Sequence, residues 1–267
     1  IRGGLLYLAE RKREFPETTG VIAATTGNHG QSIAFAARET GLRCVIVVPK
    51  GNNPEKNAAM KALGAELIEH GSEFQDALEY SRELATRESL HAVPSFHSRL
   101  VCGVATYALE LFRSVGDLDV VFVPIGLGSG FCGIAAAREA LGLKTKIIGV
   151  VSAHAPAYAL SFCQGKLVEQ SSKTRVAEGV ACRTPNEEAL AHILQHAEDV
   201  ITVTDLEVMD GMRDLIEATR NLAEGAGALA YAGLRNQREQ WQGKRVACIL
   251  TGGNVSTAIL QEVLTMP

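Results

Sequence analysis

The sequence has few aromatic residues and lacks the features that mark several special classes of protein. Aromatic side chains make up 5% of the 267 residues. No apolar run approaches the roughly 18 residues that a transmembrane helix needs, so no membrane span is expected. Lys and Arg together number 26 against 30 Asp and Glu, and the formal net charge of −4 gives no electrostatic reason to expect a nucleic-acid partner.

The six cysteines form no CxxC pair, and several lie inside apolar runs. This spacing is typical of buried thiols in a reducing compartment, so a cytoplasmic location is expected. The sequence begins at Ile1 without an initiator Met. We therefore expect the biological N-terminus, and any targeting signal in it, to lie outside the printed chain.

Short β-branched runs alternate with helical patterns along the whole chain, which predicts an α/β fold built from βαβ units. Most expected strands are continuous apolar runs, as is typical when helices cover both faces of a parallel sheet. The pattern breaks around residues 94–99, which predicts a smaller lobe before the break and a larger one after it. The least regular stretch, residues 161–185, is expected to line a pocket. Strands are expected at residues 20–24, 43–48, 66–69, 120–124, 146–151, 200–203 and 245–250, and helices at 29–39, 54–63, 73–88, 99–113, 131–141, 205–220 and 227–239.

The first chemically informative motif follows a predicted buried strand and opens a helix. It spans residues 25–31 and reads TTGNHGQ. A helix N-terminus presents free N–H groups and partial positive charge, so this turn is suited to an anion or a carboxylate. A helix cap and a glycine turn would explain Thr26 and Gly27 but do not require Asn28 and His29.

A glycine-rich loop, residues 126–130, forms the second motif between another predicted strand and helix. Such a loop brings bare backbone N–H groups up to a phosphate. A dinucleotide pattern, G-x-G-x-x-G, also fits from Gly128 to Gly133. The next predicted strand ends at His154 without the Asp or Glu that would bind a ribose, so a ligand with one phosphate is favoured.

The third motif, residues 251–254 or TGGN, lies at the end of the last predicted strand. Its two glycines would let the backbone pass close to a flat ligand, although a structural turn explains them equally well. The carboxyl ends of parallel strands meet at one edge of a sheet, where α/β folds bind ligands.

Taken in order, residues 1–4, 25–31, 126–130, 224–227 and 251–254 resemble the serine/threonine dehydratases, pyridoxal-phosphate enzymes of fold type II (the tryptophan synthase β-like group). The resemblance covers nearly the whole chain. It implies two open, mostly parallel twisted sheets covered by helices, with the cofactor in the cleft between two lobes. Residues 1–18 would belong to the large lobe, whose N-terminal portion is missing, residues 19–97 to a small βαβα lobe, and residues 98–267 to the large cofactor-binding lobe.

The resemblance also implies roles for single residues toward pyridoxal 5'-phosphate. The Schiff-base lysine would be the residue immediately before Ile1, outside the printed chain, and Lys50 and Lys56 are interpreted as surface or capping groups. Asn28 would contact the ring hydroxyl, and Thr251 would face the ring nitrogen. The cofactor phosphate would be held by the backbone of Gly126, Leu127, Gly128, Ser129 and Gly130, a loop in which Leu127 and Ser129 replace two glycines of the usual run.

The same resemblance assigns the amino-acid substrate to the first motif. Its carboxylate would be bound by Thr25, Thr26, Asn28 and His29, with Glu178 near its side chain and Thr26 as a candidate catalytic residue. The segment after the sixth strand, residues 152–158, lacks the carboxylates with which related racemases bind a divalent metal, so no metal site is expected.

The predicted activity is dehydration and deamination of a β-hydroxy amino acid, threonine, serine or a modified hydroxy acid, to a 2-oxo acid and ammonia. This makes the predicted enzyme an ammonia-lyase, and the family's usual form implies a homodimer. Two alternatives within the fold remain open, an amino-acid racemase and a β-replacement synthase. A third alternative is a non-catalytic module that binds a phosphate ligand.

Overall fold

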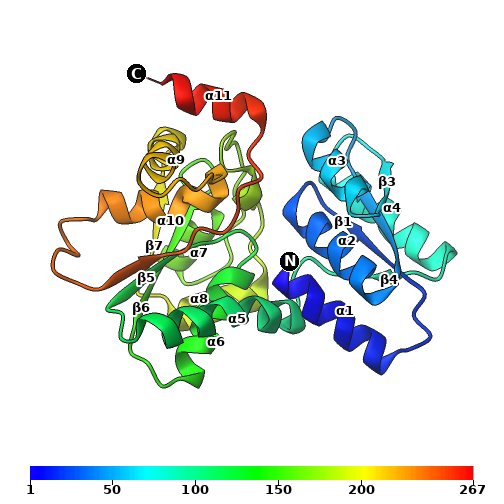
Figure 1. Cartoon of the computed structure of the whole chain (residues 1–267), viewed down its shortest axis with the longest axis horizontal. Coiled ribbons are helices and arrows are strands. Elements are labelled where there is room, and N and C mark those ends of the chain that lie inside the picture. Colours follow the sequence, from blue (N-terminus) through cyan, green and yellow to red (C-terminus); the bar gives the residue numbers. More distant parts are fainter. Residues whose placement is uncertain (267) are drawn as a thin grey trace. The chain divides into compact units, whose positions relative to one another are not determined.

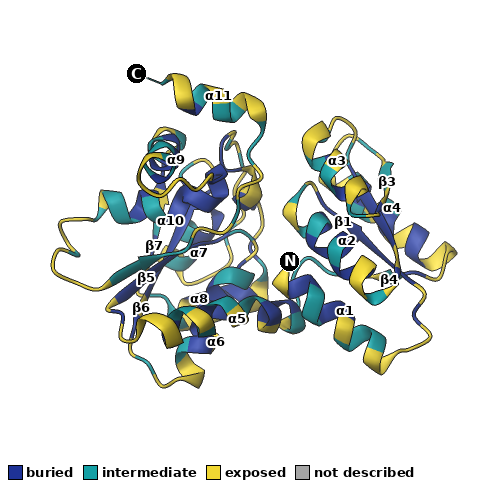
Figure 2. Ribbon diagram, viewed as in Figure 1, coloured by how far each residue is buried: buried dark blue, intermediate teal, exposed yellow. Residues whose placement is uncertain are grey.

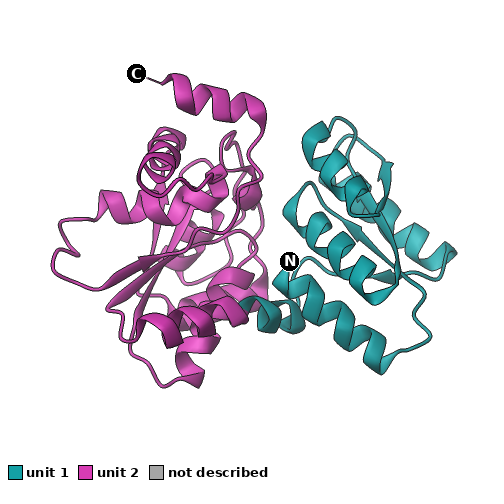
Figure 3. Ribbon diagram, in the orientation of Figure 1, with its two compact units in different colours: residues 1–104 teal, residues 105–267 magenta. Residues whose placement is uncertain are grey.

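The computed structural model describes residues 1–266, and the chain divides into two compact units. Unit 1 comprises Ile1–Val104 and unit 2 comprises Ala105–Pro267 (Figure 3). The division falls inside one helix, α5 (Ser98–Val115). No helix among the described residues is both long and apolar enough to cross a membrane.

Unit 1 is built on a four-stranded parallel sheet with the strand order β3-β2-β1-β4 (Figure 1). The two central strands are apolar and almost wholly buried, because helices cover both faces of the sheet (Figure 2). The elements of this unit before α5 are α1 (Arg2–Glu14), β1 (Gly20–Ala24), α2 (Asn28–Thr40), β2 (Arg43–Val48), α3 (Pro54–Ala62), β3 (Glu66–Glu69), α4 (Phe74–Arg87) and β4 (His91–Ala92).

Local signals in the sequence fix the ends of these helices. The Asn53 side chain accepts hydrogen bonds from the N–H groups of Glu55 and Lys56, and Pro54 occupies the first turn, so α3 begins where the sequence indicates. Gly41 ends α2 with a φ of +67°, a conformation that favours glycine.

Unit 2 repeats the same parallel arrangement with the order β7-β6-β5-β8. Its core is formed by β5 and β6 with two helices, α9 and α10, and includes the buried side chains of Phe122, Met212 and Leu229. The elements of this unit after α5 are β5 (Val120–Pro124), α6 (Ser129–Ala140), β6 (Lys146–Ser152), α7 (Ala157–Gln164), η1 (Glu178–Val180, a 3₁₀ turn), α8 (Glu187–His196), β7 (Asp199–Val203), α9 (Asp205–Thr219), α10 (Gly225–Asn236), β8 (Val246–Cys248) and α11 (Thr257–Thr265).

The strand order places a switch point in each sheet. The chain crosses from the first strand of a unit to the second on one side, and the fourth strand pairs with the first on the other side. Open α/β sheets bind ligands outside the carboxyl ends of the strands at such a point. In unit 1 this point lies between β1 and β4, and in unit 2 between β5 and β8.

The α/β class and the two parallel sheets predicted from the sequence are confirmed. All seven predicted strands are present, and their ends agree within two residues. The prediction missed β4, which is only two residues long, and the helices α1, α7, α8 and α11. Residues 161–185 are less irregular than expected, because α7 extends into them and η1 lies within them.

The domain assignment stays a prediction, and the division at residue 104 differs from the expected boundary at residue 97. Helix α1 packs on α2 inside unit 1, whereas the sequence assigned residues 1–18 to the large lobe. Gly4 on α1 and Ser32 on α2 are small enough to permit this packing. A Cβ at Gly4 would lie only 2.8 Å from the Ser32 carbonyl oxygen. Pro267, the last residue of the expected large lobe, lies outside the described residues.

Candidate functional site

The turn between β1 and α2 carries the first predicted motif. Thr25 is buried at the end of β1, and its hydroxyl oxygen accepts a hydrogen bond from the Gly27 N–H at 3.1 Å. Helix α2 begins at Asn28, so Thr26 and Asn28 are exposed at the helix N-terminus. The structure therefore brings the predicted substrate residues of unit 1 together at a positive helix end.

The imidazole of His29 has an unsatisfied nitrogen. Its Nε2 atom is buried and has no hydrogen-bond partner among the described residues. Burial lowers the pKa of His29 to about 4, so the ring is neutral at neutral pH. A buried polar atom without a partner is rare in folded proteins and indicates a group that a ligand can satisfy.

Lys56, expected from the sequence to be a surface or capping group, lies beside the same turn. A Cβ placed on Gly27 would lie 3.4 Å from the Lys56 Cδ and 3.9 Å from its Nζ. The side chain reaches back from the first turn of α3 to the N-terminus of α2. The ammonium group adds to the positive field of the helix end, which favours an anionic ligand. This contact could not be predicted from spacing in the sequence, because it depends on how α3 packs against α2.

The glycine loop of unit 2, residues 126–130, occupies the equivalent place after β5. Gly128 has a φ of +100°, and a Cβ there would lie 2.6 Å from the Cβ of Ala189. Within residues 1–266, none of the backbone N–H groups of the loop donates a hydrogen bond to another protein group. The loop therefore offers several free donors at the N-terminus of α6, the arrangement that binds phosphate groups.

Two tyrosines fix the carbonyl groups of this loop. The Tyr158 hydroxyl donates to the Leu127 carbonyl oxygen at 2.9 Å, and the Tyr107 hydroxyl donates to the Gly130 carbonyl oxygen at 3.3 Å. Tyr158 also accepts a hydrogen bond from the Asn186 N–H at 3.0 Å. Neither tyrosine could be identified from the sequence, because each comes from a helix distant in the chain from the loop.

The third motif follows β8, the strand that pairs with β5. Thr251 is exposed just beyond the strand, and the Gly252 carbonyl oxygen accepts a hydrogen bond from the Glu224 N–H at 3.0 Å. Gly227 on α10 is in contact with the Gly252 carbonyl, which leaves no room for a side chain. Because β5 and β8 are parallel neighbours, Thr251 and the glycine loop lie at the same edge of the sheet.

Glu178 is exposed in η1, and this turn lies next to the glycine loop. A Cβ at Gly126 would lie 3.1 Å from the Gly179 carbonyl oxygen and 3.7 Å from the Val180 Cα. The irregular segment predicted to line a pocket thus reaches the loop through this turn. Each of the two units therefore gathers its own predicted residues, Thr25, Thr26, Asn28 and His29 in unit 1 and residues 126–130, Glu178 and Thr251 in unit 2.

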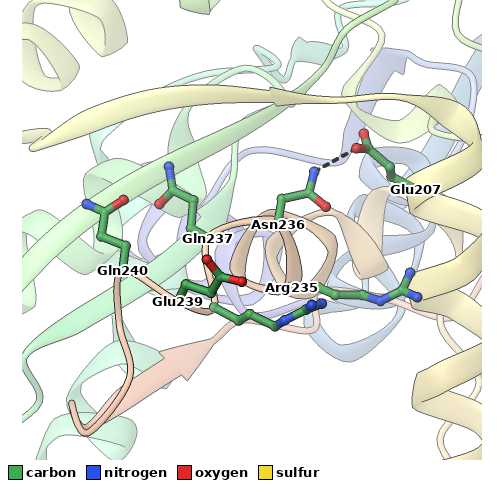
Figure 4. Close-up of a pocket in the computed structure, with 7 residues that line it drawn as sticks. Glu207, Arg235, Asn236, Gln237, Glu239 and Gln240 are labelled. Carbon is green, nitrogen blue, oxygen red and sulfur yellow. Dashed lines mark hydrogen bonds between the residues drawn. The ribbon is translucent and has the colours of Figure 1, made fainter.

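A separate polar hollow lies at the C-terminal end of α10, beside the start of α9 (Figure 4). Within it Asn236 donates a hydrogen bond to Glu207 at 2.8 Å, and Arg235 pairs with Asp210 on α9 at 2.9 Å. None of the predicted site residues lines it. The hollow therefore has no part in the site described above.

The segment after β6 was expected to hold no metal ion. Its histidine, His154, lies 3.3 Å from a carboxylate oxygen of Asp205. Among residues 1–266, no three His, Cys, Asp or Glu side chains are grouped closely enough to hold a metal ion. The expectation of no metal nevertheless stays a prediction.

A family comparison shows what this chain is related to. The model of the family described as "Pyridoxal-phosphate dependent enzyme" matches residues 1–252. The chain belongs to this family. Its cofactor is accordingly pyridoxal phosphate, as predicted.

Individual relatives give the same result. The chain is 33% identical over 266 residues to the L-threonine dehydratase biosynthetic IlvA of Haemophilus influenzae, covering 98% of this chain and 52% of that protein. It is 33% identical over 249 residues to the L-threo-3-hydroxyaspartate ammonia-lyase of Saccharomyces cerevisiae, covering 93% of this chain and 75% of that protein. The chain thus spans about half the length of the first of these relatives.

Among solved structures, the processed form of threonine deaminase isoform 2 from Solanum lycopersicum superposes with a TM-score of 0.91 at 28% identity. The match covers 98% of this chain and 77% of that chain. Pyridoxal phosphate fits the residues present, because the loop at 126–130 offers free N–H donors for its phosphate. A Cβ on Gly128 would collide with Ala189, so this shape of the loop requires glycine at that position.

Proposed function

We propose that this chain carries the cofactor and substrate sites of a pyridoxal-phosphate-dependent ammonia-lyase acting on a small β-hydroxy amino acid. The products would be a 2-oxo acid and ammonia, with threonine and serine as the first candidate substrates and a hydroxylated acidic amino acid as the next. The observation that carries this proposal is the glycine loop with its unused N–H groups. The threonine dehydratase and hydroxyaspartate ammonia-lyase relatives support the reaction class.

In this proposal, residues 126–130 hold the cofactor phosphate through backbone N–H groups. Asn28 contacts the ring hydroxyl, and the Thr251 hydroxyl faces the ring nitrogen. When bound, pyridoxal phosphate supplies an electron-withdrawing ring that makes the Cα proton of an amino acid acidic. Because a hydroxyl cannot hold a proton on the ring nitrogen as a carboxylate would, Thr251 favours direct loss of the β-hydroxyl group.

The substrate carboxylate is assigned to the turn of residues 25–29. The partial positive charge at the start of α2 and the Lys56 ammonium group both attract an anion there. His29 stays neutral, so it can donate or accept a hydrogen bond without adding charge. Thr26 carries the exposed hydroxyl group closest in sequence to this helix end. It is the candidate catalytic residue that would donate or accept a proton. Glu178 is assigned to the substrate side chain.

The proposal is tested with the full-length protein supplied with pyridoxal phosphate. Release of a 2-oxo acid is measured with L-threonine, L-serine and L-threo-3-hydroxyaspartate, before and after borohydride reduction of the bound cofactor. We expect release from at least one substrate and its loss after reduction. Formation of the D-amino acid without oxo acid would instead favour the racemase, and failure to bind the cofactor would contradict the proposal altogether.

Two further predictions accompany the proposed activity. A homodimer is expected, and sedimentation of the full-length protein tests it. The cytoplasmic location is likewise a prediction, which localisation of the tagged full-length protein tests.

A further inference from the structure

The glycine loop of unit 2 achieves its shape with only one unusual backbone conformation. Of its five residues, Gly128 alone has a positive φ, at +100°. Leu127 and Ser129 therefore adopt backbone angles that any residue can take. Glycine flexibility alone does not determine the direction in which the N–H groups of the loop point, so contacts from outside the loop must do so.

Tyr158 makes the contact that fixes this direction. The residue is 1% exposed, and burial raises the pKa of its hydroxyl, which therefore stays protonated. Its proton is donated to the Leu127 carbonyl oxygen at 2.9 Å, while its oxygen accepts from the Asn186 N–H at 3.0 Å. Both hydrogen-bonding functions of the phenol are thus used, one of them on the loop.

The geometry of the peptide bond carries this contact to the opposite side of the loop. The Leu127 carbonyl and the Gly128 N–H belong to one planar trans peptide, in which the two groups point in opposite directions. Holding the carbonyl on Tyr158 therefore directs the Gly128 N–H away from Tyr158.

The neighbouring helix α8 packs against the same loop. The Asn186 side chain caps α8 by accepting a hydrogen bond from the Ala189 N–H at 3.0 Å. The Ala189 methyl group lies against Gly128, where a Cβ would be 2.6 Å away. Tyr158 and the first turn of α8 therefore both lie against this part of the loop, Tyr158 at the Leu127 carbonyl and Ala189 at Gly128.

We propose that Tyr158 is a positioning residue, whose hydroxyl orients the Gly128 N–H toward the phosphate of the cofactor. The residue acts through the Leu127 carbonyl and does not itself touch the ligand. This inference rests on the proposed placement of the phosphate at residues 126–130. It adds a residue that determines phosphate binding, and neither the glycine pattern nor the position of Tyr158 in the sequence indicates this role.

The test compares Tyr158→Phe with Tyr231→Phe in the full-length protein. Tyr231 is the matched control, because its hydroxyl donates to Asp214 at 3.1 Å on α9 and makes no contact with the loop. The dissociation constants of pyridoxal phosphate and of pyridoxal, which lacks the phosphate, are measured by equilibrium titration. Losing the oriented hydrogen bond is expected to weaken pyridoxal phosphate binding about 5- to 30-fold.

Comparison of the two ligands separates the possible outcomes. We expect Tyr158→Phe to change pyridoxal affinity less than about twofold, and Tyr231→Phe to change neither affinity. An unchanged affinity for pyridoxal phosphate, or equal weakening of both ligands, would overturn the positioning role. If the wild-type protein binds neither ligand, the proposed function fails, and that failure is recognisable before any variant is compared.

A second measurement needs no variant and so does not depend on the folding of Tyr158→Phe. In ¹⁵N-labelled wild-type protein, saturating inorganic phosphate should shift the Gly128 amide proton resonance downfield, because this N–H faces the anion. A Gly128 resonance that stays in place while other loop amides shift would contradict the inference.

Discussion

The two units of this chain share one strand order but differ in the chemistry that follows their first strands. In unit 1, the turn after β1 carries two hydroxyls, a carboxamide and an imidazole, with the Lys56 ammonium group beside it. In unit 2, the loop after β5 offers mainly backbone N–H groups, and its shape is fixed by Tyr158 and Ala189. We therefore propose that the same topological position serves two kinds of recognition.

This difference matches the ligands proposed for the two places. A phosphate carries charge on several oxygens and suits a ring of similar N–H donors, which bare backbone provides. A substrate carboxylate must be held while other groups of the same molecule react, and distinct side chains at fixed positions suit that task. We therefore expect substitutions in unit 2 to affect cofactor affinity first and substitutions in unit 1 to affect substrate use first.

The largest effect is expected from Gly128→Ala in unit 2. The new Cβ would overlap the Ala189 methyl group, and a φ of +100° is strained for alanine. We expect a loss of about 4 kcal/mol in unfolding free energy and more than about 100-fold in cofactor affinity. Thermal unfolding and cofactor titration measure the two quantities.

Gly142→Ala is the matched control for this substitution. Gly142 also has a positive φ, at +64°, but no atom lies within 4 Å of a Cβ placed there. Only backbone strain of about 1 kcal/mol is then expected, with cofactor affinity unchanged. Equal effects of the two substitutions would show that strain alone, and not the fit of the loop against α8, explains the loss.

A smaller effect is expected from the pH dependence of unit 1. The pKa of His29 is lowered to about 4 in the folded chain, below the value of about 6.5 in an unfolded one. Above pH 6.5 both states hold a neutral ring, and as the pH falls toward 4 only the unfolded state binds the proton. Stability should therefore fall over this range, by up to about 3 kcal/mol.

Urea unfolding of the cofactor-free protein between pH 4 and 7 measures this fall. In His29→Asn the dependence on pH should become shallower than in the wild-type protein. An unaltered slope in His29→Asn would show that His29 is not the group responsible.

The smallest effect is expected from Lys56→Gln, which removes the charge beside Gly27. The KM for the amino-acid substrate should rise about fivefold, because one partly exposed charge contributes on the order of 1 kcal/mol to anion binding. Lys61→Gln, on the exposed end of α3, is the control and should leave KM unchanged. If both substitutions raise KM equally, the effect reflects the overall charge of α3 and not the position of Lys56.

Much of the fold could be predicted from the sequence because its strands are continuous apolar runs. β1 and β5 can be recognised as such runs, and the motifs that follow them indicate where the next helices begin. β4 could not be predicted, since His91 and Ala92 form a strand only through their pairing with Val21 and Ile22. α7 and α8 were missed because each is a short helix next to a polar, irregular segment, so no helical period can be recognised in their sequences.

The site could be predicted only as far as it is local in the chain. Thr25 to His29 and residues 126–130 each lie on one turn, and their residue types indicate anion binding directly. The contacts of Lys56 and Tyr158 depend instead on the packing of other helices against those turns. Neither residue has a local pattern that distinguishes it from an ordinary surface lysine or core tyrosine.

Cofactor titration of two variants, one from each unit, tests the division of roles most directly. The dissociation constant of pyridoxal phosphate is measured in wild-type, Gly128→Ala and Lys56→Gln full-length protein under one set of conditions. We predict a rise of more than about 100-fold for Gly128→Ala and of less than about twofold for Lys56→Gln. A comparable rise in both variants, or a larger one in Lys56→Gln, would contradict the assignment of the phosphate to unit 2 and of the substrate carboxylate to unit 1.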